Sequence, residues 1–521
     1  MSNQPKAQAD TKPIWDRLRG LPQPSLTELF DADEARVEKL SQRLEFDLGE
    51  FGPAAMRFDW SKTHLDDDVL GAFEELAQVA EFSAAREALF DGSIVNPTEG
   101  RPATHGAMRG SGSEADVEEA QALLARMGML VEAVHQGAFG DIHHLIHIGI
   151  GGSALGPDLA VAALTRDLSL VDVHVVSNID GLALEQAFAA CDPATTLIAV
   201  ASKTFTTTET MTNAASALKW LADNGVDDPS GRVIALTANP ERAVEWGVDE
   251  TRILPFPESV GGRYSLWSSI GFPVALAVGM EDFSAMLAGA KAMDIHFREA
   301  EGRDNAPLLA AFSDLYYSRV RGCQTRAVFA YDERLALLPD YLQQLEMESN
   351  GKGVTTSGEP VDQPTAPITW GGVGTDAQHA VFQLLHQGTH LVPVDLIASI
   401  APGDELDPAH HKALLANCFA QGAALMAGGN MSADGKDPAR AFAGNRPSAT
   451  ILLDDCDPAT FGALIAFHEH RTFANAVLMG INPFDQFGVE LGKKMAKDVE
   501  SGGGALDAST QALMVAAGLA E

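Results

Sequence analysis

The alternation of apolar and polar positions along the chain predicts parallel sheets covered by helices. In the first half, short runs rich in β-branched residues are expected to form strands at residues 145–150, 172–178, 196–201 and 232–237. Ala- and Leu-rich stretches with helical spacing, such as residues 154–165 and 207–222, lie between them. Strands that alternate with helices in this way are typical of βαβ units, whose strands run parallel.

The same alternation restarts after a long, mostly apolar helix predicted at residues 266–279. Further strands are expected at residues 327–331, 367–370, 391–396, 449–453 and 477–481. Helices are expected at residues 308–320, 339–348, 379–386, 411–427 and 488–499. The simplest architecture is therefore α/β, with two parallel-sheet α/β/α sandwich domains in tandem.

The two ends of the chain differ from this pattern. Residues 26–48 and 66–90 carry apolar residues at helical spacing, with little strand signal. Gly502–Gly504 is a predicted hinge before a terminal helix at residues 507–519. We expect an N-terminal helical region that packs on the second domain, two α/β domains and a C-terminal helical arm, at residues 1–110, 111–285, 286–500 and 501–521.

Composition and charge restrict the possible partners. The 521 residues carry a formal net charge of −36, which repels nucleic acid and anionic lipid. An anionic substrate would also be repelled, so a phosphate site has to use a few local cations and backbone dipoles. The four cysteines are scattered, as expected of reduced thiols. Without a secretory signal or a spanning apolar stretch in the sequence, we expect a cytoplasmic protein.

Two motifs are candidates for an anion site. Gly149–Gly156 follows a predicted strand and opens a helix, which suits a structural turn, a dinucleotide site with Asp180, or a sugar-phosphate site. Residues 202–210, Ser-Lys-Thr-Phe-Thr-Thr-Thr-Glu-Thr, surround a scarce lysine with hydroxyls at the start of a helix. Such a cradle suits a phosphate monoester, although a helix N-cap without a ligand is the alternative.

Four more segments carry candidate chemistry. Arg263 follows two glycines before an apolar helix and is either an oxyanion-stabilising cation or a buried structural arginine. Gln344 and Glu348 share one helical face, where Glu348 is a candidate base. With Thr375 as the expected N-cap, His379 lies in a first helical turn, which favours a neutral ring. Lys493 lies one turn into a helix beside Asp485 and Gln486.

The histidines do not predict a metal site. His143, His144 and His147 lack the spacing of a metal-binding helix, so structural roles are expected. His379 and His386 are two turns apart, which is too far to chelate one ion from a straight helix.

Taken together, these segments resemble the phosphoglucose isomerase family, which is built from two sugar-isomerase domains. The likeness covers about residues 96–513 in order, and its most specific blocks are GGRYSLWSSIG at 261–271 and GVELGKKMAK at 488–497. The resemblance implies a cytoplasmic, homodimeric isomerase that interconverts glucose 6-phosphate and fructose 6-phosphate through ring opening and a cis-enediol. The resemblance implies a phosphorylated hexose as the binding partner. It implies no cofactor and no metal.

The resemblance also implies roles for individual residues. Glu348 would be the base, Arg263 would stabilise the enediolate, and His379 of the neighbouring subunit would open the ring with Lys493, oriented by Glu209. The residues expected to bind substrate or shape the pocket are Gly152, Ser153, Ser202, Lys203, Thr204, Thr207, Gly262, Gln344 and Gln486.

The chain departs from the family pattern at Ala154, at Gly372-Val373 and at Asp376-Ala377. These departures affect the expected loop geometry around His379 and the preference between epimers. Two alternatives stay open for this sequence: a related isomerase that also accepts mannose 6-phosphate, and a non-catalytic sugar-phosphate sensor. A nicotinamide-dependent oxidoreductase is a third, more distant alternative.

Overall fold

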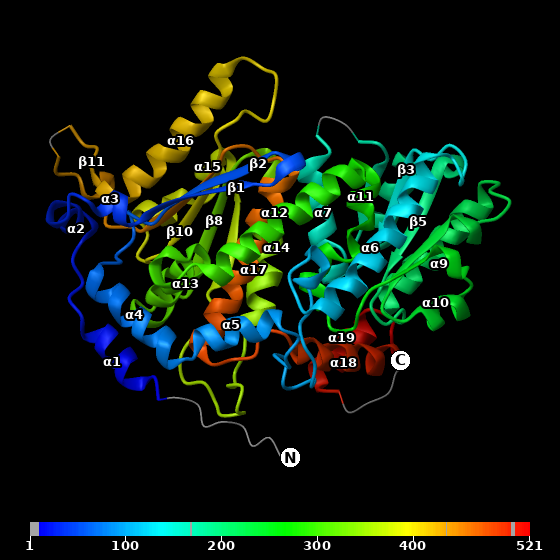
Figure 1. Ribbon diagram of the computed structural model, residues 1–521, viewed down its shortest axis with the longest axis horizontal. Helices are drawn as coiled ribbons and strands as arrows, with labels where there is room; N and C mark the ends of the chain where they lie inside the picture. The colour runs from blue at the N-terminus through cyan, green and yellow to red at the C-terminus, as the bar shows by residue number, and fades with distance from the viewer. Residues whose placement is uncertain (1–9, 167–168, 434, 502–505, 521) are drawn as a thin grey trace. The chain divides into compact units, whose positions relative to one another are not determined.

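A computed structural model describes residues 10–166, 169–433, 435–501 and 506–520. The chain divides into two compact units, one reaching to Pro483 and one from Phe484 to Glu521. The second unit contains α18 (Glu490–Glu500) and α19 (Ala508–Ala516), which match two of the predicted helices (Figure 1). The predicted hinge at Gly502–Gly504 lies outside the described residues.

The first sheet has five parallel strands in the order β4-β3-β5-β6-β7. Four of them are the predicted strands: β3 (His144–Ile148), β4 (Asp172–Val176), β5 (Thr196–Ala201) and β6 (Val233–Thr237). The fifth, β7 (Ile253–Pro255), was not predicted, because a strand of three residues carries too little periodicity.

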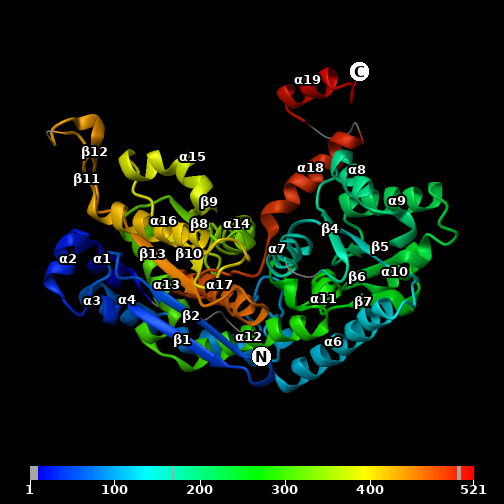
Figure 2. The ribbon, with the colours of Figure 1, turned by 90° about the horizontal axis from the view of Figure 1, so that it is seen from above.

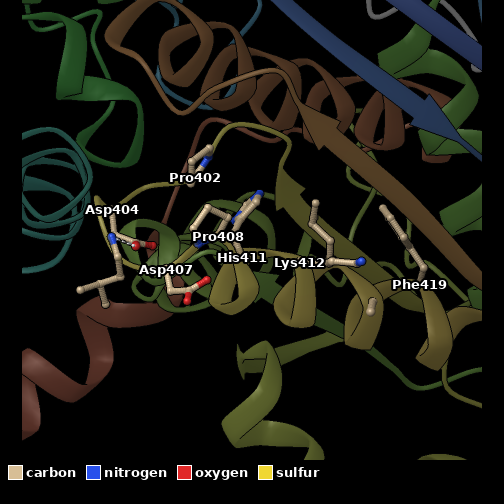
Figure 3. Close-up of a pocket in the computed structure, with 10 residues that line it drawn as sticks. Pro402, Asp404, Asp407, Pro408, His411, Lys412 and Phe419 are labelled. Carbon is tan, nitrogen blue, oxygen red and sulfur yellow. Dashed lines mark hydrogen bonds between the residues drawn. The ribbon is translucent and has the colours of Figure 1, made fainter.

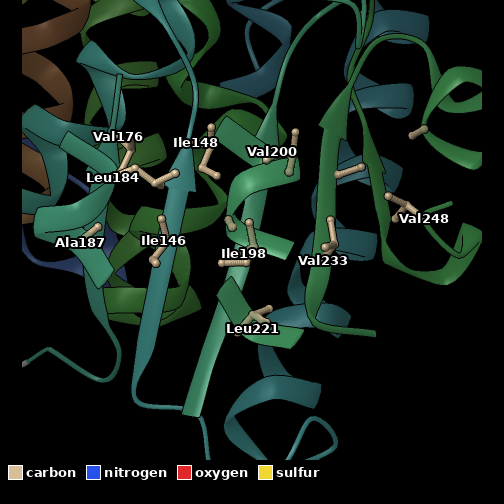
Figure 4. Packing of buried hydrophobic residues seen from close by; sticks show 14 of the residues in the cluster. Ile146, Ile148, Val176, Leu184, Ala187, Ile198, Val200, Leu221, Val233 and Val248 are labelled. Atoms are coloured by element: carbon tan, nitrogen blue, oxygen red, sulfur yellow. The ribbon is translucent and has the colours of Figure 1, made fainter. Parts of the chain in front are cut away.

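Buried aliphatic side chains join this sheet to its helices. Ile146 and Ile148 of β3 and Ile198 of β5 pack against Leu184 of α8 (Gly181–Ala190) and Leu221 of α9 (Thr208–Asp223) (Figure 4). The helices α6 (Glu114–His135) and α11 (Phe272–Val278) cover the opposite face, and α10 (Pro240–Trp246) follows β6 (Figure 2). All six residues of β5 are buried, as expected for a central strand of a parallel sheet.

The second sheet has the order β1-β2-β13-β10-β8-β9. Its parallel strands β8 (Thr325–Tyr331), β9 (Ile368–Val373), β10 (Val394–Ser399) and β13 (Ser448–Leu453) were all predicted. β2 (Pro53–Asp59) pairs antiparallel with β13 and forms a hairpin with β1 (Ser41–Asp47). The N-terminal region therefore contributes strands to this sheet, which the sequence interpretation missed.

The hairpin shows why the prediction of helix up to residue 48 was wrong. In β1, Leu44 and Phe46 are half-buried, while Arg43, Glu45 and Asp47 are exposed. This alternation has the period of a strand. A turn at Gly49, whose φ is +63°, then returns the chain into β2. The segment before it is indeed helical, in α2 (Leu26–Ala32) and α3 (Arg36–Lys39).

Two other predicted elements were wrong. Residues 477–481 are not a strand, because α17 (Pro458–Met479) extends into them. Twenty of its 22 residues are buried, polar ones such as His468 and Arg471 included, so it has no solvent-exposed face and its last turn resembles a buried strand. The long helix expected at residues 266–279 is instead two 3₁₀ turns followed by α11, since Pro273 opens a new helix.

The remaining helices surround the second sheet. Five match predicted helices: α7 (Leu155–Leu164), α13 (Ala306–Leu315), α14 (Leu338–Asn350), α15 (Gly374–Gln387) and α16 (Pro408–Ala427). The stretch with helical spacing at residues 66–90 forms α4 (Asp67–Val79) and α5 (Phe82–Phe90), and the others include α1 (Lys12–Gly20) and α12 (Met280–Glu299). The predicted fold class is thus confirmed, whereas the four domain boundaries stay predictions. Among the described residues, no helix is long and apolar enough to cross a membrane.

Candidate active site

The turn after β3 holds the first predicted site residues. It forms the 3₁₀ turn η3 (Gly151–Ser153), which leads into α7 at the carboxyl edge of the first sheet. His147 of β3 contacts the carbonyl oxygen of Ser153 through Nε2 at 2.7 Å. Burial lowers the pKa of His147 to about 4, so the ring is neutral and donates this hydrogen bond. The predicted structural role of His147 is confirmed.

Gly152 and Gly262 meet backbone to backbone. A Cβ at Gly152 would collide with the carbonyl group of Gly262 and the amide nitrogen of Arg263. Ser265 reinforces the contact by donating its hydroxyl to the Gly262 carbonyl at 2.7 Å and to the Gly152 carbonyl at 3.3 Å. The close approach of these segments, 110 positions apart, therefore requires glycine at position 152.

The hydroxyl-rich segment lies at the same edge of the sheet, because β5 is the parallel neighbour of β3. The hydroxyls of Ser202 and Thr207 are 3.0 Å apart, and those of Thr204 and Thr206 are 2.8 Å apart. Phe205 bends the loop with a φ of +52°. Thr207 is the N-cap of α9, but its side chain makes no capping hydrogen bond. The alternative interpretation, a helix N-cap without a ligand, would require the Thr207 hydroxyl to cap α9, and it does not.

Lys203 joins this loop to the next motif. Its ammonium group donates to the carbonyl oxygens of Glu258 at 2.6 Å and Val260 at 3.1 Å, just before the Gly-Gly-Arg turn. Burial, with a smaller effect of the nearby Arg101, lowers the pKa of Lys203 to about 8. An anion bound beside this ammonium would reverse part of that shift, because opposite charges favour the protonated form.

Arg263 and Glu348 form the charged centre of the cluster. Nη1 of Arg263 lies 3.4 Å from Oε2 of Glu348, and both side chains are mostly buried. Arg263 also donates to the Ser349 hydroxyl through Nε at 2.6 Å and to the Pro483 carbonyl. Oε2 of Glu348 is buried and accepts no hydrogen bond from the described residues. The carboxylate therefore has an acceptor oxygen available for a proton.

Gln344 connects this centre to the first turn. It lies one helical turn before Glu348 on α14, and its amide nitrogen is 3.1 Å from the position of a Cβ on Gly151. Gly151 has a φ of +57°, a left-handed conformation that glycine adopts without strain. The structure thus brings together the turn after β3, the Lys203 loop, the Gly262-Arg263 turn and the helix face of Gln344 and Glu348.

His379 is separate from these contacts. It is exposed on α15 and makes no hydrogen bond or ion pair within the part of the chain that the structure describes. The N-cap of α15 is Val373, not Thr375, so His379 lies in the second turn and not in the first as predicted. Its neighbour Gln378 points inward and bonds to Tyr331 and Asn417. Glu209 is half-buried in the first turn of α9.

Gln486 and Lys493 belong to the second unit, which is described by itself. Gln486 precedes the 3₁₀ turn Phe487–Val489, and Lys493 is exposed on α18. None of the residues of α18, all of them described, is buried, although Leu491 and Met495 belong to one apolar face. The roles predicted for Gln486 and Lys493 stay predictions.

Sequence reasoning missed the partners that hold Arg263. Ser349 is fully buried and contacts both Arg263 and the Tyr264 hydroxyl, the latter at 2.9 Å. His105 stacks on the Tyr264 ring with centroids 4.6 Å apart. Only the position of Ser349, directly after the candidate base, offered a signal in the sequence.

A separate pocket of about 500 Å³ lies at the start of α16 (Figure 3). Its lining comes entirely from residues 402–419, outside every predicted site segment. Leu406 and Phe419, which line it, are 66% and 46% exposed. The lining is largely apolar, carries two aspartates together with Lys412 and His411, and includes no serine or threonine hydroxyl, unlike the predicted phosphate cradle.

Comparisons with known proteins agree with the chemistry of the cluster. A profile of the family described as phosphoglucose isomerase matches residues 59–514. The chain is 74% identical to glucose-6-phosphate isomerase of Erythrobacter litoralis, over 97% of this chain and 98% of that one. It is 66% identical to the enzyme of the same name from Novosphingobium aromaticivorans, over 98% and 99%.

The fold gives the same result. The crystal structure of a glucose-6-phosphate isomerase from Chlamydia trachomatis matches with a TM-score of 0.85 and 30% identity, over 94% of this chain and 95% of that chain. Sequence and fold are therefore similar over nearly the whole length, and the chain belongs to the phosphoglucose isomerase family.

Proposed function

We propose that this chain interconverts glucose 6-phosphate and fructose 6-phosphate, with Glu348 as the base that moves a proton between carbon 2 and carbon 1. The observation that carries the proposal is the buried Oε2 of Glu348, which accepts no hydrogen bond from any described residue and is 3.4 Å from Arg263. The carboxylate takes the proton from carbon 2 of the open-chain aldose, and the carbonyl oxygen becomes an enediolate. The hydroxyl proton moves from the oxygen on carbon 2 to the oxygen on carbon 1, and return of the abstracted proton to carbon 1 gives the ketose.

Arg263 stabilises the negative charge that develops on the enediolate. A fixed guanidinium in a buried site is well suited to this, since it needs no reorganisation during the reaction. Its bonds to Ser349 and to the Pro483 carbonyl hold it in place. Gln344 and Gln486, with the close approach at Gly262, shape the surroundings of the reacting carbons.

The phosphate group is bound by the hydroxyls of Ser202, Thr204 and Thr207 and by the Lys203 ammonium. The N-terminus of α9 adds its dipole, and the turn at Gly152 and Ser153 adds backbone N–H groups. This local positive potential is what a chain of net charge −36 needs to attract a dianion.

We assign ring opening to His379 and Lys493, with Glu209 orienting the histidine, and we place His379 in the site of a second subunit. Support comes from the exposure of His379 and its lack of partners among the described residues. Apolar side chains exposed nearby on α15 and α16, including Leu384 and Phe419, suit a homodimer. The family resemblance supports the same assembly, and we place the enzyme in the cytoplasm.

The function is tested by incubating the purified protein with fructose 6-phosphate and a chelator, and then identifying the products. Glucose 6-phosphate is expected, without added nucleotide or metal. A protein that binds the sugar phosphate but forms no product is a sensor, and this outcome contradicts the proposal. Appearance of mannose 6-phosphate at a similar rate would show that the selectivity between epimers is lost.

The phosphate cradle is tested by Thr207→Val, which removes the hydroxyl and keeps the shape of the side chain. We expect KM for fructose 6-phosphate, and Ki for an anionic competitor, to rise about 10- to 100-fold, as for the loss of a hydrogen bond to a charged group. The melting temperature should change little, because Thr207 makes no capping bond.

Thr212→Val, on the exposed surface of the same helix, is the matched control and should leave both constants unchanged. Lower stability of Thr207→Val with an unchanged Ki would mean that the hydroxyl only caps α9.

A further inference from the structure

Three side chains with ligand chemistry converge at the opposite end of the first sheet. His144 is the first residue of β3, His174 lies in β4, and Cys191 directly follows α8. One nitrogen from each ring and the Cys191 sulfur all lie within 4.8 Å of one another. The predicted sugar-phosphate residues follow the carboxyl ends of β3 and β5, whereas His144 begins β3. The two clusters are therefore at opposite ends of the strands.

The two histidines have ring nitrogens without partners. Nδ1 of His144 and Nε2 of His174 are buried and bond to no other described group. The ring centroids are 6.0 Å apart. A buried polar atom without a partner costs free energy, and a bound metal ion is one way to satisfy such a nitrogen.

The local charges favour a cation at this position. His174 lies in β4, the strand that pairs with β3 and so brings the two imidazole rings together. Asp172 of β4 is the register partner of His144 and adds a negative charge. Cys191 is buried.

We propose that His144, His174 and Cys191 form a binding site for Zn²⁺, with water as the fourth ligand. Imidazole and thiolate ligands select zinc over magnesium or calcium. Zinc binds nitrogen at about 2.0–2.1 Å and sulfur at about 2.3 Å. The three ligand atoms, which lie within 4.8 Å of one another, therefore have to move closer together by rotation of their side chains. On binding, the sulfur–zinc bond forms and the thiol proton leaves to solvent.

The site is structural and not catalytic. β4 is the edge strand of the sheet and pairs only with β3. An ion held by β3, β4 and the segment after α8 would tie this edge to the sheet, at a distance from the reacting carbons. Zinc should therefore raise the melting temperature without being needed for isomerisation.

The test uses the full chain, stripped with a chelator and dialysed. We expect one Zn²⁺ per chain in competition with a chromophoric chelator, and a higher melting temperature with zinc. With Co²⁺ as the probe, a thiolate-to-cobalt charge-transfer band should appear. Loss of outer-shell partners costs zinc sites about 10- to 100-fold in affinity, so His174→Asn and Cys191→Ser should cost more than about 100-fold.

His143→Asn is the matched control, because His143 is exposed, adjacent to His144 and paired with Asp141. It should keep the wild-type affinity. The fold of each variant is checked by circular dichroism, and His144→Gln replaces any variant that fails to fold. No zinc binding by the wild type, or equal affinity in His174→Asn and His143→Asn, would overturn the proposal. So would a cobalt band that survives Cys191→Ser.

Discussion

Glu348→Gln is expected to lower kcat by about 100- to 10,000-fold, or further, while KM changes little. Glutamine keeps the size of the side chain but cannot accept the proton from carbon 2. The loss should be at the upper end of this range, because Oε2 of Glu348 is buried beside Arg263 and no described residue donates a hydrogen bond to it. We expect kcat to be affected and substrate affinity to be kept, since the phosphate half of the cluster is untouched.

The assay follows glucose 6-phosphate formation, together with exchange of the substrate proton at carbon 2 in deuterated water. Both signals should disappear in Glu348→Gln. Glu299→Gln, at an exposed position of α12, is the control for a carboxylate-to-amide change and should retain both. Glu348→Gln with a rate within a few-fold of wild type would remove Glu348 from the mechanism.

The parallel strands were predicted well because each is a short, β-branched run between helical stretches. β5 illustrates this, since the predicted and observed limits are both 196 and 201. The errors have physical causes. α17 is buried on nearly all sides, so its last turn lacks the exposed polar residues that mark a surface helix. The β1–β2 hairpin was missed because β1 is only half-buried and follows two helices, and because three consecutive residues of β2 are buried, which breaks its alternation.

The candidate site was predicted as separate segments, and the fold explains what joins them. Nothing in the sequence shows that Gly152 and Gly262 meet, or that Lys203 donates to carbonyls before the Arg263 turn. These contacts depend on tertiary packing between segments some 55 to 110 residues apart. The exception is the pair Gln344 and Glu348, because helical spacing alone puts them on one face.

The histidines also show that spacing along the chain does not reveal which side chains the fold brings together. The expectation of no metal site came from spacing within one segment, and that criterion applies to ligands on one helix or loop. His144, His174 and Cys191 come from two strands and the end of a helix, and parallel pairing of β3 and β4 brings them together. Four free, buried cysteines agree with the predicted reduced thiols, but burial alone does not distinguish Cys191 from the other three.

Because His379 makes no hydrogen bond or ion pair with the described residues of its own chain, we predict that it completes the active site of the second subunit. Inactive Glu348→Gln and crippled His379→Ala, unfolded and refolded together, should recover activity well above that of either parent. In a mixed dimer with crossed sites, one site carries both lesions and the other carries neither. Random assembly makes half of the dimers mixed, so about one quarter of all sites should be intact.

The matched control mixes Glu348→Gln with Arg263→Lys. These two residues are 3.4 Å apart in the same chain, so every site in that mixture keeps one lesion and activity should not return. If His379 acted within its own chain, the first mixture would behave like this control. Mixed dimers are verified by an affinity tag on one parent. Their presence without recovered activity would refute the shared site, while the isomerase assignment would stand on the rate of the wild-type enzyme.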